Sequence, residues 1–184
     1  MAILIDAYSV DNGAFSTSFH STGDHGWAQS FNVTATGVLT KVTFYLIRTG
    51  SPTGNATASL YNFSGSFGSS AVPSGAALAT SDNIDVSTIP TSLTLVSFYF
   101  SGANQLLLTS GEQYMISIEY GIGVGDASNK IGARLDNSSP THPGSSSQKT
   151  VNNTWSTSSH DMIFYIYVGP FSEKTTFYLT QGFQ

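Results

Sequence analysis

The three glutamates of this 184-residue chain are the side chains best suited to hydrolysing a glycosidic bond. That reaction needs two carboxyl groups that face each other across the bond. Glu112 lies in a turn signal, Glu119 follows on the outward side of an alternating strand, and Glu173 lies near the C-terminus. Because no Glu-x-Asp-x-Glu cluster occurs, we interpret Glu119 as a single solvent-facing charge. The spacing therefore gives no support for a glycan-active enzyme.

The histidines are the next residues that could do chemistry, either as the base of a hydrolytic triad or as metal ligands. The four are His20, His25, His142 and His160. No Gly-x-Ser-x-Gly motif occurs, and the neighbours in Asp24-His25 and in His160-Asp161 would point to opposite faces of a strand. The histidines also lack the spacing of zinc sites, and the chain has no cysteine. We therefore expect a protein that is not an enzyme and needs no cofactor.

The aspartates leave structural calcium as an open alternative, because sandwich modules often hold this ion with Asp side chains and loop carbonyls. None of them forms an EF-hand-like loop, and several suit turns and caps. We assign no ligands, so the identity of any metal site stays unknown. The candidates are Asp6, Asp11, Asp24, Asp82, Asp85, Asp126, Asp136 and Asp161.

Trp155 is the best candidate for contact with a sugar, because an exposed Trp combines a large apolar face with a polar handle. It lies in the polar segment 151–156 beside the long loop 137–148, whereas Trp27 precedes a core-like alternation. Two interpretations stay open: Trp155 stacks on a glycan, or it caps the end of the fold. In the first case its companions on loops would be Asn129, Asp136, His142 and Asn152.

Strands must position these residues, because helical periodicity is hard to find in the chain. Polar and apolar residues alternate in 42–46, 56–60 and 114–120, as expected of strands with one face on a core. The runs 93–100 and 162–168 are apolar on both faces, which predicts central strands or strands with both faces covered. Weaker candidates bring the total to about ten: Ile3–Tyr8, 27–33, 78–84, 105–108, 131–135 and 175–179.

Short strands between turn-rich loops predict an all-β fold, an antiparallel jelly-roll-like β-sandwich, as one domain over residues 1–168. Residues 169–184 would form a short C-terminal extension or arm. The arm either adds a strand to a neighbour's sheet, which would make a homo-oligomer, or folds back on its own sandwich. Its aromatic residues would be costly in water and useful at such an interface: Phe171, Phe177, Tyr178 and Phe183.

The chain carries few charges, and this argues against two classes of partner. Only 9 % of its residues are charged and the net charge is −5, whereas an ordinary domain has roughly 25 % charged residues. Its six Lys and Arg residues are scattered, so we expect no binding to nucleic acid or anionic membranes. The N-terminal residues lack a secretory signal pattern. We therefore expect a location outside the cell, reached after signal removal or by release of virus particles.

The order of the segments resembles the choice-of-anchor type of β-sandwich module, which occurs in bacterial surface proteins and phage structural proteins. The matching segments are 27–31, 39–46, 50–55, 58–61, 73–81, 98–100, 106–114 and 161–167. The resemblance covers roughly residues 5–168. It implies a jelly-roll module that is not catalytic and is akin to carbohydrate-binding modules. Its motifs are structural, so it provides no catalytic residues and specifies fold better than function.

These observations predict a non-enzymatic structural or accessory module of an extracellular assembly, with a capacity for glycan adhesion. The resemblance and the missing signal favour the surface of a phage virion, as a capsid decoration, fibre or tail protein. Its partners would then be further copies of itself, other virion structural proteins or a surface glycan. The alternative is a carbohydrate-binding or adhesion module of a secreted bacterial protein.

Overall fold

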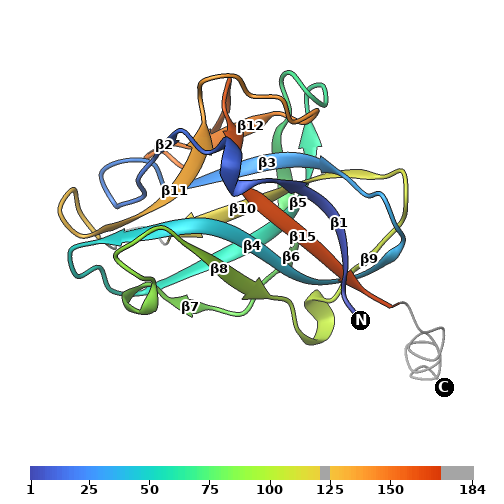
Figure 1. Ribbon diagram of the computed structural model, residues 1–184, viewed down its shortest axis with the longest axis horizontal. Coiled ribbons are helices and arrows are strands. Elements are labelled where there is room, and N and C mark those ends of the chain that lie inside the picture. Colours follow the sequence, from blue (N-terminus) through green and yellow to red (C-terminus); the bar gives the residue numbers. More distant parts are fainter. Residues whose placement is uncertain (121–124, 171–184) are drawn as a thin grey trace.

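The computed structural model describes residues 1–120 and 125–170, which fold into two antiparallel sheets (Figure 1). The predicted all-β sandwich is confirmed. Within the described residues, one sheet has eight strands: β1 (Ile3–Tyr8), β2 (Phe15–Ser16), β4 (Gly37–Thr49), β8 (Thr94–Tyr99), β9 (Leu107–Leu108), β11 (Lys130–Asp136), β14 (Asp161–Met162) and β15 (Phe164–Gly169). The other has seven: β3 (Gly26–Asn32), β5 (Asn55–Ser64), β6 (Val72–Thr80), β7 (Ile84–Asp85), β10 (Gln113–Tyr120), β12 (Ser146–Lys149) and β13 (Trp155–Ser158).

Helical structure in the described residues is confined to three short 3-10 turns at Val10–Asn12, Val86–Thr88 and Gly102–Asn104. None of the described helices has the length and apolar character needed to cross a membrane. The expected arm at 169–184 lies almost wholly outside the described residues, and so do its four aromatic residues.

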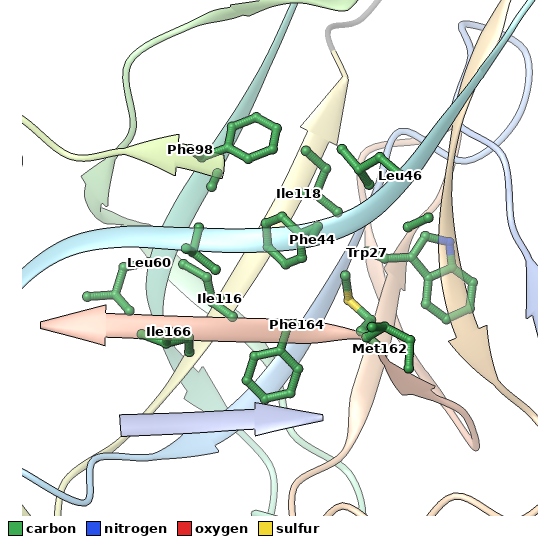
Figure 2. Packing of buried hydrophobic residues seen from close by; sticks show 14 of the residues in the cluster. Trp27, Phe44, Leu46, Leu60, Phe98, Ile116, Ile118, Met162, Phe164 and Ile166 are labelled. Carbon is green, nitrogen blue, oxygen red and sulfur yellow. The ribbon is translucent and has the colours of Figure 1, made fainter. Parts of the chain in front are cut away.

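The main core lies between the two sheets and is built by the predicted alternation. In β4, Phe44 and Leu46 are fully buried, and in β10 the same is true of Ile116 and Ile118 (Figure 2). The ring of Phe44 meets that of Phe98 edge to face, with centroids 5.8 Å apart. Burying each such side chain contributes about 1.5–3 kcal/mol, so the core fixes which face of every strand is left for other roles.

A second, smaller apolar cluster covers part of the outer face of the seven-stranded sheet. Ala28, Ala71 and Met115 are buried there, and half-buried Tyr61, Phe63 and Trp155 pack against them. The segment that joins β5 to β6 supplies Ala71, so this connection lies against the sheet and does not project into solvent. Residues on the outer face of β3, β10 and β12 are therefore enclosed except at the two ends of the cluster.

The expectation for the run 93–100 is wrong, because within residues 1–120 and 125–170 β8 is paired on one side only. It pairs with β4, and the outward side chains of Leu95 and Tyr99 are 46 % and 58 % exposed. Aromatic and β-branched residues suit an edge strand as well as a central one, so composition did not separate the two. The run 162–168 corresponds to β14 and β15, and β15 is central as expected, between β1 and β4.

Candidate functional site

A pocket of about 340 Å³ opens on the seven-stranded sheet where β10 and β12 end. Apolar atoms make up most of its exposed wall, and the polar groups among them are amides, hydroxyls and one ion pair. The lining residues are His25, Asn55, Thr57, Glu119, Tyr120, Lys149 and Asn153. Because neighbouring strands place residues of one register on the same face, Thr57, Glu119 and Lys149 come together from three strands that are distant in sequence.

Glu119 is held by three donors. Its Oε1 accepts hydrogen bonds from the hydroxyls of Tyr61 and Ser117, both at 2.8 Å, and its Oε2 lies 2.6 Å from Nζ of Lys149. Burial, followed by the adjacent charge of Glu119, raises the pKa of Tyr61. The carboxylate thus serves as a fixed acceptor for these three groups.

Trp155 lies beside this pocket, on the strand next to Lys149. The two residues face each other in the β12–β13 pair, and Nζ of Lys149 is 5.7 Å from the centre of the Trp155 ring. On its other side the indole meets Tyr61 edge to face at 6.3 Å. Trp155 is half-buried and packs against the outer cluster. It lies beside the pocket without being one of its lining residues, and its stacking on a glycan stays a prediction.

His25 and Asn153 close the pocket opposite Glu119. Asn153 lies in the tight turn between β12 and β13, where its φ of 59° is in the left-handed region that Asn tolerates better than most residues. In this conformation its Oδ1 lies 3.0 Å from Nδ1 of the buried His25. The turn is itself tied by a hydrogen bond from the N–H of Asn153 to the carbonyl of Thr150. The turn and His25 are therefore joined by a side-chain hydrogen bond on this side of the pocket.

The expected companion His142 is buried elsewhere, in a polar network that links both sheets. Its Nδ1 accepts the N–H of Gly144 at 3.0 Å and faces Nε2 of Gln29 at 3.2 Å. The N–H of Met162 donates to Oε1 of Gln29, which fixes the direction of the amide. Nδ1 of His142 is therefore an acceptor, and Nε2 carries the proton that faces Asp6 Oδ1 at 3.3 Å.

Asp136 and Asp161 complete this network. Burial raises the pKa of Asp161 although it accepts the N–H of His142 at 2.9 Å. For Asp136 burial also acts to raise the pKa, but hydrogen bonds from Tyr8 and Ser138 outweigh it and lower the pKa to about 2. The polar atoms of Asp136 and His142 are thus engaged within the protein, where they anchor the segment 137–145.

The other two expected companions lie on separate turns. Asn129 precedes β11, accepts the N–H of Ser51 and donates to the carboxylate of Asp126. Asn152 is exposed in the β12–β13 turn, near Trp155 in the chain. The structure therefore places Trp155 and Asn152 on one hairpin, and it does not bring all five expected residues into one site.

Sequence reasoning did not assign His25, Asn55, Thr57, Lys149 and Asn153 to a site. Alternation in 114–120 did place Glu119 outward, but its partner Lys149 depends on the register of β3 between β10 and β12. Among the described residues, no group of three or more His, Cys, Asp or Glu is placed to hold a metal ion. Calcium bound mainly through carbonyls stays an untested alternative.

No protein-family model matches the chain, and no curated protein matches it significantly. The resemblance to choice-of-anchor modules therefore stays a prediction.

Proposed function

We propose that this protein is a non-enzymatic binding module that adheres to a glycan through the pocket bordered by Trp155, His25 and Lys149. The observation that carries the proposal is a half-buried indole beside an open pocket, whose wall joins mostly apolar surface to a few amides, hydroxyls and one ion pair. A sugar ring presents an apolar face to an aromatic residue and hydroxyls to polar ones. A preformed cleft with a few fixed polar groups is the usual form of a small-ligand site.

The chemistry of Glu119 favours binding over hydrolysis. Glycoside hydrolysis needs a second carboxyl group across the bond, and among the described residues that line the pocket Glu119 is the only acidic one. Its two oxygens already accept three hydrogen bonds. A carboxylate held in this way orients its neighbours.

We further propose that the module belongs to an extracellular assembly. The resemblance to modules of phage structural proteins supports the virion surface as the place, and a secreted bacterial adhesin is the alternative. Immunogold electron microscopy of the native source tests this part separately. Labelling spread regularly over particles is the expected result, and labelling of cell surfaces alone would favour the bacterial alternative.

The binding proposal is tested with a glycan array probed by the full chain, followed by calorimetry on the best ligand. We expect Trp155→Ala and Asn55→Ala each to weaken binding at least tenfold, which corresponds to about 1.4 kcal/mol. Asn55 lines the pocket from the exposed start of β5, so its variant should fold normally. Tyr99→Ala, at an exposed aromatic residue of the other sheet, is the matched control. Absence of glycan binding, or binding that both pocket variants leave unchanged, would contradict the proposal.

A further inference from the structure

The outer face of the eight-stranded sheet carries exposed apolar side chains at the end where β15 leaves the sandwich. The strands β1, β15, β4 and β8 lie side by side (Figure 1), and one register row crosses them from Leu4 through Tyr167 and Lys41 to Tyr99. Leu4 and Tyr99 are 48 % and 58 % exposed. Because Val42, which follows Lys41, is fully buried in the core, alternation places this row on the outward side of the sheet.

A second row of the same face lies beside the point where the chain leaves the sheet. Gly169, the last residue of β15, pairs with Val38 of β4, and Val38 pairs with Leu107 on its other side. Leu107 is 40 % exposed, whereas the next residue, Leu108, is fully buried in the core. We call the side chains of the two rows the exit patch: Leu4, Val38, Lys41, Tyr99, Leu107 and Tyr167.

The exit patch is contiguous and almost uncharged. Its one charged residue is Lys41, whose Nζ lies 4.0 Å from the centre of the Tyr167 ring. A cation over an aromatic face is partly compensated there, and the aliphatic stem of the lysine adds to the apolar surface. Single exposed apolar residues are ordinary, but a contiguous group of them on one face is typical of a surface that another segment covers.

The chain itself contains a segment of matching chemistry. Residues 171–184 lie outside the described residues and follow Pro170, which is adjacent to Gly169 of the second row. The segment has one acidic and one basic residue, Glu173 and Lys174, so its docking would bring no net side-chain charge onto the patch. Aromatic side chains provide a large contact area at an interface. The segment contains four of them: Phe171, Phe177, Tyr178 and Phe183.

Reach and tethering favour the segment of the same chain over that of another copy. The fourteen residues 171–184 could span up to about 46 Å when extended, whereas the three strand spacings from β1 to β8 amount to about 15 Å. A segment tethered beside its own docking surface has an effective concentration of the order of millimolar. In a dilute solution, this concentration far exceeds that of the same segment on other molecules.

We propose that residues 171–184 dock on the exit patch of their own chain and cover Leu4, Tyr99 and Leu107. Of the two arrangements that the sequence leaves open for this segment, this is the one in which it folds back on its own sandwich. The apolar outer face would then be covered without a partner molecule. The pocket beside Trp155 belongs to the other sheet and would stay open, so this docking does not depend on glycan binding.

The test is paramagnetic relaxation enhancement in the ¹⁵N-labelled full chain. Because the chain has no cysteine, Thr180→Cys provides a single position for a nitroxide label. A segment that does not dock also spends time near its point of attachment. The baseline is therefore the same labelled chain with Phe177→Ser and Tyr178→Ser, which removes two aromatic residues without altering the described sandwich.

The amide signals of Leu4, Tyr99 and Leu107 should lose at least about twice as much intensity with the unaltered segment as with the serine baseline, because docking holds the label beside them. Leu107→Ser should remove most of this excess. Leu78→Ser should leave it unchanged and is the matched control, since Leu78 is 39 % exposed and lies on β6 of the other sheet. Unchanged thermal midpoints should confirm that both leucine variants fold, and the serine baseline decides the question if Leu107→Ser does not.

Three results would overturn the proposal. The first is equal loss of intensity with the unaltered segment and with the serine baseline. The second is loss that appears only when a ¹⁵N-labelled chain without nitroxide is mixed with a nitroxide-labelled chain without ¹⁵N, since this would assign the exit patch to the segment of a second copy. The third is an equal effect of Leu78→Ser and Leu107→Ser, which would mean that the segment has no preference for this face.

Discussion

Nζ of Lys149 lies 2.6 Å from Oε2 of Glu119, although a whole strand separates β12 from β10. The intervening residue on β3 is Gly26, which pairs with Glu119 on one side and with Lys149 on the other. The ion pair spans the strand because this position has no side chain. An added Cβ would come within 2.6 Å of the carbonyl oxygen of Ile118 and 3.0 Å of Cγ of Glu119.

Gly26→Ala should therefore destabilise the protein by about 1–3 kcal/mol, the usual cost of forcing a methyl group into a packed site. Urea denaturation followed by tryptophan fluorescence measures the change. Ser117→Ala, on the same face of the neighbouring strand, removes one hydrogen bond to Glu119 without adding volume and should cost less. If Gly26→Ala is as stable as the unaltered chain, the ion pair between Lys149 and Glu119 does not depend on the missing side chain at this position.

Replacing Lys149 by Met should cost about 1–3 kcal/mol, because it leaves the charge of Glu119 in a site where its side chain is only 16 % exposed. The double variant Lys149→Met with Glu119→Gln removes both charges and should recover part of the loss. Denaturation midpoints in low and high salt measure both effects. If the double variant loses as much unfolding free energy as Lys149→Met and Glu119→Gln lose together, or more, the two charges are not coupled as we describe.

Asp136 should make the stability depend on pH in the acid range. Its pKa is lowered in the folded protein to about 2 from an ordinary value of 3.8. The unfolded chain therefore binds the proton more readily, so this group stabilises the fold above about pH 4 and the contribution is lost as the pH falls toward 2. The difference in unfolding free energy between the unaltered chain and Asp136→Asn should shrink over that interval. A difference that stays constant from pH 5 to pH 2 would contradict the assignment.

Nδ1 of His142 should be the hydrogen-bond acceptor of the ring, and Nε2 should carry the ring proton. Two donors, the N–H of Gly144 and the amide of Gln29, point at Nδ1, so a second proton there would face them directly. Long-range ¹H–¹⁵N correlation spectra of the imidazole distinguish the two tautomers. The exposed imidazole of a histidine in a denatured sample serves as the reference. Spectra that place the ring proton on Nδ1 would show that the network is arranged differently.

Much of the fold follows from alternation along the chain. In 114–120 the pattern correctly separated Ile116 and Ile118, which enter the core, from Glu119, which does not. A strand buries every second residue, so two or three apolar residues at this spacing determine its orientation. The same reasoning placed Phe44 and Leu46 inside.

The candidate site was less accessible to such reasoning, because β12, which supplies Lys149, is a polar strand. The sequence Ser146–Lys149 has none of the aromatic or β-branched residues that indicate a strand, yet it pairs with β3 and β13 throughout. The fold as a whole determines that β3 and β13 pair with this segment. Because the strand begins at Ser146, the loop expected at 137–148 ends earlier than predicted. The burial of His142 and Asp136 depends on donors from β1 and β3, which no local pattern reveals.

The pairing of β1 with β15 has a mechanical consequence. The strands are antiparallel and adjacent, with Ile3 opposite Val168 and Tyr8 opposite Phe164, so the polypeptide enters and leaves the sandwich at the same end (Figure 1). Tension between these two ends would pull apart one residue pair at a time, starting at Ile3. Tension between the pocket beside Trp155 and the end of β15 would instead be carried through the core to the opposite sheet. A module that is anchored at the end of β15 and bound through the pocket would therefore resist force better than a module pulled between its two chain ends.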